Sequence, residues 1–451
     1  KIGSALFLTS FTTAAGFFSL IVTNVMIIKE FGIILAFGII LTFILSIIII
    51  PIFLSFKSLP PKREIKRLIE GGKFKIAEKL NNWSKMFPNT IMILTSVVVI
   101  LAVFGVTKMN YNGTILDDLR PGNRIYDDIQ FFESNLGGTL PIEIIIDGKE
   151  ENAVLKPDFL KKVEIFISTI SDSISDLHSP VSIVAILKSF NYNNGKYQLN
   201  EKYEDNLSDV ILIGQQNEGI IKQFLGEDAS KIRISCRLEN ITFSRSIDIK
   251  DEISTIYSNI FNDDPSKSLL LTGGTFLALK TNKHMLNNLS SSFVLAFIII
   301  FIAIIILFNS IRLSLLSILP NMIPLLVAGA LMGYFDIILR PATAMIFSIA
   351  LGISVDNTIH FLTRFRAEFI QHNDYSMAVS NTLLTTGKAI ISTGIILSLG
   401  FMVFYFSSFK PNHEFGILAT IILFTSMFAS MVLLPVMINR IKPSFRFKDV
   451  N

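Results

Sequence analysis

The chain has 451 residues, of which 51% are hydrophobic and only 17% are charged. This balance excludes an ordinary soluble domain and is typical of a protein that crosses a membrane several times. The net charge of +4 does not indicate a nucleic-acid-binding surface, and the single cysteine excludes an internal disulfide. Because the chain begins with Lys1 and an apolar span, without a signal-peptide pattern, we expect it to be truncated at its N-terminus.

Eight apolar segments are long enough to cross a bilayer. In chain order they are Gly3–Val22, Phe31–Phe56, Thr90–Thr107, Ser291–Asn309, Leu313–Phe335, Ala342–Leu362, Ala389–Ser407 and Phe415–Ile438. Counting crossings places every strongly basic short loop on one side, including the segment Lys57–Lys85, Arg364 and Arg440. The excess of Lys and Arg predicts that this side is cytoplasmic and that Lys108–Asn288 lies outside.

The long stretch outside the membrane has the patterns of a soluble domain. Strands are predicted at Ile142–Ile146, Lys231–Leu238 and Ser268–Thr272, and helices at Asp158–Ile170 and Ser246–Phe261. Because strand, helix and strand alternate, we expect an α+β domain of ferredoxin-like type. The segment Asn191–Asp205, rich in Asn, Tyr and Lys, is predicted to be a surface loop or hairpin.

The beginning and the end of the chain repeat each other. A shift of 384 positions, without gaps, places Gly3 on Gly387, Thr9 on Thr393, Gly16 on Gly400, Glu30-Phe31-Gly32 on Glu414-Phe415-Gly416 and Pro51 on Pro435. Two unrelated apolar segments do not easily match at Gly, Glu and Pro in one register. Parallel repeats are a transporter architecture, in which the site lies near the midplane where the halves meet.

The repeat and the spans together predict the organisation of the chain. We expect the last two spans of a first half at 1–56, a basic cytoplasmic linker at 57–87, the first span of a second half at 88–107, the outside α+β domain at 108–289, five more spans at 290–440 and a cytoplasmic tail at 441–451. The outside domain and the earlier spans of the first half would then be missing.

The span Thr343–Arg366 is the most informative, because it carries an acid within an apolar helix. An acid at such a position costs roughly 2.5–3.5 kcal/mol, so Asp356 is expected to serve function. His360 projects from the same helix face one turn later, and Gly352, one turn earlier, lets a neighbouring helix approach. Asn357 follows the acid directly. The alternative is a helix end whose polar groups reach the lipid headgroups.

Hydroxyl groups near the start of the next-to-last span are candidates for a proton relay. They are Thr385, Thr386, Ser392 and Thr393, of which Thr393 is the preferred candidate, and Thr9, Thr12 and Thr13 lie at the equivalent place in the first half. Such a hydroxyl can pass a proton to a carboxylate. It can equally hold two helices together or bond to a carbonyl of its own helix.

Two further features have a structural explanation. Glu30 and Glu414 each open a span, where the helix dipole favours negative charge by ~0.3–1 kcal/mol. Pro320 and Pro324 lie inside one span, where they predict a kink and a hinge.

Motifs for catalysis are absent from the sequence. It contains no GxxxxGK[ST], HExxH, CxxC or GxSxG pattern. One carboxylate and one histidine, Asp356 and His360, are too few ligands for a metal site. We therefore expect a protein that is not an enzyme and that holds no metal or organic cofactor.

Several motifs together resemble the resistance-nodulation-division (RND) superfamily, in its MMPL and hopanoid-exporter-like branch. They are Gly352-x-x-x-Asp356, Leu319-Pro-Asn-x-x-Pro324, Glu30-Phe-Gly32 and Asp117-Asp-Leu-Arg-Pro121. Patched, Dispatched and sterol-sensing domains are more distant relatives. The resemblance implies an α-helical polytopic membrane protein of twelve spans, of which this chain would hold the fifth to the twelfth, with an extracytoplasmic ferredoxin-like porter domain.

The resemblance also implies a mechanism. The aspartate of the family's GxxxD helix, here Asp356, takes up protons and couples their inward flow to movements of the porter domains. Asn357 stands where many relatives carry a second acid or a tyrosine, so no paired-acid site is carried over. Protons would be the coupling ion, and no cofactor is implied.

We therefore expect proton-driven export of a hydrophobic or lipid-like substrate from a bacterial inner membrane, with the porter domain in the periplasm. The expected partners are membrane lipids, the substrate, the missing N-terminal half, and a second copy or a periplasmic protein; no nucleic acid is expected. The alternative is a lipid or sterol sensor, or a protein-translocation accessory, that has the same fold but does not transport.

Overall fold

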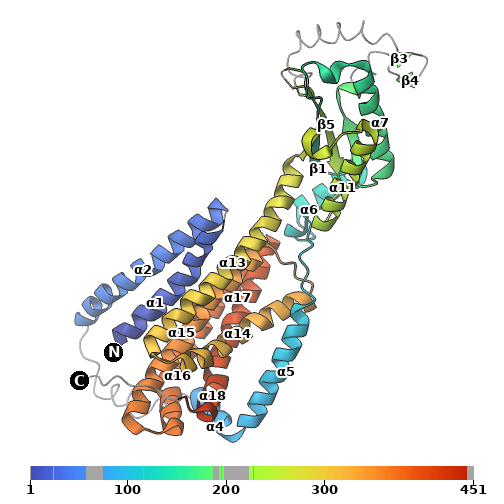
Figure 1. Ribbon diagram of the computed structural model, residues 1–451. Helices are drawn as coiled ribbons and strands as arrows, with labels where there is room; N and C mark the ends of the chain where they lie inside the picture. Colours follow the sequence, from blue (N-terminus) through green and yellow to red (C-terminus); the bar gives the residue numbers. More distant parts are fainter. Residues whose placement is uncertain are drawn as a thin grey trace. The chain divides into compact units, whose positions relative to one another are not determined.

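The computed structural model describes residues 2–23, 25–56, 75–114, 116–185, 192–193, 196–197, 223–226 and 228–443. The chain divides into two compact units. Unit 1 comprises Lys1–Tyr111 and His284–Asn451, and unit 2 comprises Asn112–Lys283. Unit 1 is a bundle of helices, and unit 2 carries a sheet with helices packed on it (Figure 1).

The helices of unit 1 correspond to the predicted spans, except α4, which lies in the predicted linker. They are α1 (Ile2–Phe18), α2 (Met26–Ser55), α4 (Lys75–Met86), α5 (Pro88–Val106), the second part of α13 (Gly274–Phe308), α14 (Ile311–Tyr334), α15 (Pro341–His372), α16 (Tyr375–Met402), α17 (Lys410–Phe428) and α18 (Leu434–Ile441). In the described part of the chain, seven helices are long and apolar enough to cross a membrane. The first of the eight predicted spans is a shorter apolar helix, Thr9–Val22.

Helix α15 lies at the centre of unit 1, because it packs against α1, α14, α16 and α17. Its large apolar side chains, such as Phe361 and Phe365, are fully buried in the main core of the unit. Pro341 occupies the first turn of α15, where its missing N–H costs nothing. Helix α16 begins where the Asp374 side chain accepts a hydrogen bond from the backbone N–H of Met377, at 2.6 Å.

The repeat seen in the sequence is a repeat of structure in the same register. The shift of 384 positions places the last residue of α1 on the last residue of α16, and the first residue of α2 on the first of α17. It also places the 3-10 helix η1 (Ser19–Val22) on the 3-10 helix η4 (Val403–Phe406). The chain therefore builds the same hairpin of two helices at both ends.

A glycine allows the two helices of each hairpin to cross. A Cβ atom on Gly32 would lie 2.6 Å from the carbonyl oxygen of Phe17, and one on Gly416 would lie 2.9 Å from that of Phe401. Both distances are shorter than a van der Waals contact allows. The Glu-Phe-Gly motif at the start of each second helix thus serves close helix packing.

Unit 2 has the predicted ferredoxin-like topology. Its main elements are α6 (Arg124–Leu136), β1 (Leu140–Asp147), α7 (Pro157–Ser173), β2 (Leu177–Val181), β5 (Lys231–Leu238), α11 (Phe243–Phe261), α12 (Pro265–Ser268) and β6 (Leu269–Thr272). The strands are ordered β2-β5-β1-β6, and all neighbours are antiparallel. This order, with α7 after β1 and α11 after β5, is that of a β-α-β-β-α-β sheet.

The two faces of this sheet differ in chemistry because side chains alternate along a strand. On β5, Ile232, Ile234 and Cys236 are buried in the core that α7 and α11 complete, and burial raises the pKa of the Cys236 thiol to about 12. On the other face, Arg233 contacts Glu143 of β1 at 2.6 and 2.7 Å. Burial alone would raise the pKa of Glu143, but the hydrogen bonds from Arg233 and Ser235 hold it below its usual value.

Three predicted segments lie partly outside the described residues. Of the linker 57–87, residues 75–86 form α4, an amphipathic helix that packs against α16 and α18. The predicted hairpin at Asn191–Asp205 contains β3 (Tyr192–Asn193) paired with β4 (Lys196–Tyr197). The remainder of both segments and most of the tail 441–451 are outside the described residues.

Candidate functional site

Asp356 lies near the middle of α15 and carries the least satisfied polar atom of the predicted site. Its Oδ1 atom is buried, and no hydrogen-bond partner for it is present in the described part of the chain. A buried carboxylate oxygen without a partner is costly and therefore rare in a structural role. This acid is the starting point of the site.

Helix α1 covers the face of α15 on which Asp356 lies. One turn before the acid, the backbones of the two helices touch, since a Cβ atom on Gly352 would lie 3.2 Å from the Cα atom of Gly16 and 3.3 Å from the Thr12 carbonyl oxygen. Thr9 of α1 lies beside the Asp356 carboxylate. Both threonines are buried. The acid is thus enclosed between two helices in close contact.

The other predicted residues of α15 extend the site toward the basic end of the helix. Asn357, next to the acid, is buried, and His360, one turn later, is half-buried. One further turn on, Arg364 is paired with Glu368 at 2.5 Å. His360 therefore lies between the buried acid and the charged end of α15.

Thr393 is not placed beside the acid. It is exposed on α16, and its hydroxyl donates to the carbonyl oxygens of Ala389 and Ile390 at 3.0 and 3.1 Å. Among the described residues, the hydroxyl beside Asp356 belongs to Thr9, which occupies the equivalent position in the repeat. Thr9 itself donates to the carbonyl oxygen of Leu6 at 3.0 Å.

A second polar cluster, which the sequence analysis did not identify, joins α15 to α14 and α17. The side-chain oxygen of Asn321 accepts hydrogen bonds from Ser354 at 3.1 Å and from Thr358 at 3.2 Å. Thr358 also contacts the hydroxyl of Ser430 at 3.2 Å, and Ser426 donates to the Ser354 carbonyl. All these side chains are buried. In the sequence, only the position of Asn321 in the Leu-Pro-Asn motif indicated that a polar cluster could lie here.

The two prolines of that motif lie inside α14. Pro320 and Pro324 are buried and do not end the helix, which continues to Tyr334. Asn321, between them, also donates through Nδ2 to the carbonyl oxygen of Ser317 at 2.8 Å. The hinge at the prolines remains a prediction.

A buried ion pair connects the start of α15 to the start of α17. Arg340 and Glu414 are 3.2 Å apart, with side chains that are 9% and 8% exposed. The helix dipole alone therefore does not account for Glu414. Its counterpart Glu30 is exposed, as expected for an acid that only opens a helix.

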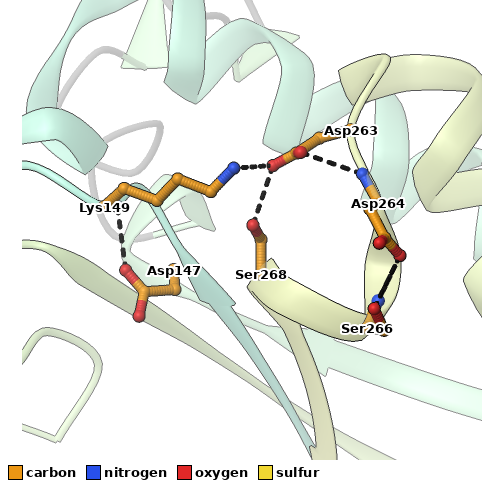
Figure 2. A network of polar contacts seen from close by, with 6 residues as sticks. All are labelled: Asp147, Lys149, Asp263, Asp264, Ser266 and Ser268. Carbon is orange, nitrogen blue, oxygen red and sulfur yellow. Dashed lines mark hydrogen bonds and ion pairs between the residues drawn. The ribbon is translucent and has the colours of Figure 1, made fainter.

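Unit 2 contains a polar network of a different kind (Figure 2). Asp263 accepts a hydrogen bond from Lys149 at 2.5 Å and another from the Ser268 hydroxyl at 2.7 Å. The Lys149 hydrogen bond, with that of Ser268, lowers the pKa of Asp263 to about 2. Lys149 also donates its backbone N–H to Asp147, so the network fastens the loop after β1 to the loop after α11. Its groups are bonded to one another, which is typical of a structural network.

No metal centre is formed by the described residues, since they contain no group of three or more His, Cys, Asp or Glu side chains with suitable spacing. Within the described residues, Asp356 and His360 therefore have no cluster of metal ligands around them. The arrangement can hold and release a proton at Asp356.

Comparisons with known proteins agree with the fold. The profile of the MMPL family matches residues 170–441, which is more than half of the chain. The chain belongs to the MMPL family. A relative of this MMPL protein is the membrane protein MJ1562 of Methanocaldococcus jannaschii, which is 22% identical over 373 residues, 80% of this chain and 93% of the relative.

A similar solved structure is that of the hedgehog release protein Disp from the water bear Hypsibius dujardini. Its TM-score is 0.62 at 14% identity, and the match covers 97% of this MMPL chain and 58% of the Disp chain. The chain thus spans little more than half the length of that protein, and the likeness shows the fold. The predicted RND resemblance and the helical fold class are confirmed, and the family and the seven apolar helices define a multi-pass membrane protein.

Proposed function

We propose that this MMPL protein exports a hydrophobic or lipid-like substrate and is driven by the proton-motive force. The observation that supports the proposal is the buried, unpaired Oδ1 atom of Asp356 at the contact of α1 and α15. An ionisable group inside a membrane-spanning bundle is by default a candidate for proton transfer.

The geometry suggests how a proton alters the bundle. As a carboxylate, Asp356 only accepts hydrogen bonds and needs donors such as the Thr9 hydroxyl. As a carboxylic acid it also donates, and the carbonyl of Thr12 near Gly352 is one of the acceptors on the facing helix. The two protonation states thus favour different contacts between α1 and α15. A proton can shift the equilibrium between two helix positions only by this difference in contacts.

The proposal also assigns roles to unit 2, to His360 and to the two prolines of α14. Unit 2 acts as a porter domain in the periplasm of a bacterial inner-membrane protein, and His360 passes protons between Asp356 and the basic end. The basic end is cytoplasmic, protons are the coupling ion, and further parts of the polypeptide, a second copy or a periplasmic protein complete the export path. Pro320 and Pro324 provide the hinge within α14.

The test uses the full-length protein in proteoliposomes with an imposed proton gradient and a fluorescent lipid analogue. Wild type is compared with Asp356→Asn, which removes the titratable group at nearly constant size. Glu30→Gln is the matched control, because Glu30 is an exposed acid of the same unit. We expect gradient-dependent export that Asp356→Asn abolishes and Glu30→Gln retains.

Proton movement is followed in the same proteoliposomes with a pH-sensitive dye. Equal export by wild type and Asp356→Asn would overturn the role of Asp356. Lipid binding without any gradient-dependent movement of lipid would overturn the transport proposal in favour of a lipid sensor of the same fold.

A further inference from the structure

A cavity of about 500 Å³ lies within unit 1, away from Asp356. Its size falls in the range of small-molecule sites, roughly 300–1,000 Å³. The cavity is lined on one side by α4 and α5, on a second by Ile323 of α14, and on a third by the end of α17 with the following turn. They are almost wholly apolar, and one of their few polar side chains, Thr95, donates its hydroxyl to the Ile91 carbonyl of its own helix at 2.8 Å. Such a lining selects a hydrocarbon ligand.

The cavity follows α5 for the depth of one lipid leaflet. Its lining residues on this side extend from Phe87 to Val98, which corresponds to about 16 Å along the helix axis. One leaflet contributes about half of the ~30 Å hydrocarbon core of a bilayer. The cavity thus has the length of one lipid chain that lies parallel to the membrane-spanning helices.

One end of the cavity is lined by Trp83 of α4, a helix that carries several lysines. Trp83 of α4 lines the cavity and is 53% exposed, which is typical of a tryptophan at the membrane–water interface. Lys79, one turn earlier, and Lys75, two turns earlier, are both exposed. Helix α18, which packs against α4 and α5, is followed by the exposed Lys442. Because Glu78 also lies on α4, the local charge is mixed, but the basic groups predominate.

The third wall of the cavity is an irregular turn that its repeat counterpart lacks. Ala429–Leu433 form a π-helix between α17 and α18, and Ala429, Val432 and Leu433 line the cavity. The equivalent stretch of α2, Leu45–Ile49, is regular α-helix. Single π turns inside helices are frequent at functional sites. The second copy of the repeat therefore has a wider turn at the cavity wall than the first.

We propose that this cavity binds an acyl chain of an anionic phospholipid, whose headgroup lies at the basic residues of α4. The apolar walls take the chain, the length matches one leaflet, and Lys75 and Lys79 attract the phosphate. Because the cavity lining does not include Asp356, the lipid site is separate from the proposed proton site.

The test measures lipid contact directly. The full-length protein is placed in nanodiscs that contain phosphatidylglycerol with a diazirine in its acyl chain, and in others with the same fraction of diazirine-labelled phosphatidylcholine. After irradiation, labelled peptides are identified by mass spectrometry. We expect phosphatidylglycerol to label the peptides that contain Thr90–Val98 and Thr425–Leu433 above all other membrane helices, and phosphatidylcholine to label them less.

Two variants and one control make the test specific. Thr95→Trp fills the cavity and is expected to lose the label, whereas Val97→Trp, on the exposed side of the same helix and outside the lining, is expected to keep it. Lys75→Gln with Lys79→Gln leaves the walls intact and is expected to reduce the preference for phosphatidylglycerol, by about fivefold for each lysine.

The outcomes are distinct from those of the export experiment. Equal labelling of the Thr95→Trp and Val97→Trp variants, or labelling spread evenly over all exposed helices, would overturn the acyl-chain site. Equal labelling by the two lipids would overturn the role of the lysines. Failure of Asp356→Asn to alter export would leave the labelling result unchanged.

Discussion

The hairpin α1–α2 and the hairpin α16–α17 have equivalent helix ends at the turn, the same 3-10 turn and the same glycine at the crossing of their helices, yet they have different surroundings. Three of the 30 residues of α2 are buried, whereas nine of the 19 residues of α17 are buried among the other helices of unit 1. A short pattern of Gly, Glu and Pro is therefore sufficient to form the hairpin. What each side chain does depends on helices that lie far away in the sequence.

The difference between the surroundings of the two hairpins is seen at four pairs of equivalent positions. In each pair one residue contacts another helix, whereas its counterpart has no such contact within the described part of the chain. The pairs are Glu414 and Glu30, Gly16 and Gly400, Thr9 and Thr393, Ser430 and Ser46. Identical substitutions at both members of a pair separate the local contribution of a residue from the contribution of its distant partner.

The largest difference is expected at the glutamates. Glu414→Gln removes the carboxylate that faces the buried Arg340 and is expected to lower the free energy of unfolding by about 3–5 kcal/mol. Glu30→Gln changes an exposed residue and is expected to stay within about 0.5 kcal/mol. Both are measured by denaturant unfolding in detergent. Replacing the pair together, by Arg340→Met with Glu414→Leu, should recover much of the loss; equal effects of the two single variants would show that the ion pair does not stabilise unit 1.

The second-largest difference in stability is expected between the two glycines. A side chain on Gly16 meets the backbone of α15 at about 3.1 Å, whereas Gly400 has no atom within 4 Å in the described structure. Gly16→Leu is therefore expected to cost about 1–3 kcal/mol by overpacking, and Gly400→Leu close to nothing. Thermal unfolding of both variants checks this. If Gly400→Leu were the more damaging substitution, another helix would have to cover that face of α16.

The threonines test the proposed site rather than stability. Thr9→Val removes the hydroxyl beside Asp356 and is expected to slow gradient-driven export about tenfold, since a hydrogen bond to a charged group contributes about 1.5 kcal/mol. Thr393→Val removes a hydroxyl that bonds only within its own helix in the described contacts, and export should be unchanged. The opposite ranking in the proteoliposome assay would assign the relay to Thr393, as the sequence alone suggests.

The serines should show the smallest difference. Ser430 is buried and contacts Thr358 of α15, so Ser430→Ala is expected to cost about 1 kcal/mol. Ser46 is half-buried and donates to the Thr42 carbonyl of its own helix, so Ser46→Ala should be nearly neutral. Unfolding of the two variants under the same conditions makes the comparison. A similar loss in both would mean that the contact between Thr358 of α15 and Ser430 of the turn after α17 adds nothing beyond helix formation.

Local patterns predicted most of the fold. The apolar spans followed from their length, because a membrane-crossing helix needs a long run of apolar residues. Strand β5 followed from alternation, and the paired hairpins from the register of the repeat. Strand β2 was missed because it is a short strand at the edge of the sheet and contains Pro180, which is tolerated only at such an edge. Asp356 stood out because an acid is rare in an apolar helix.

The partners of these residues depended on the tertiary structure. From the sequence, Thr393 was as good a neighbour for Asp356 as its repeat counterpart, and only the packing of α1 against α15 places Thr9 there. Likewise, no local pattern joins Arg340 to Glu414 or Asn321 to Thr358. The physical reason is range: hydrophobic periodicity acts between near neighbours along the chain, whereas a buried polar group is satisfied by whichever helix the fold brings against it.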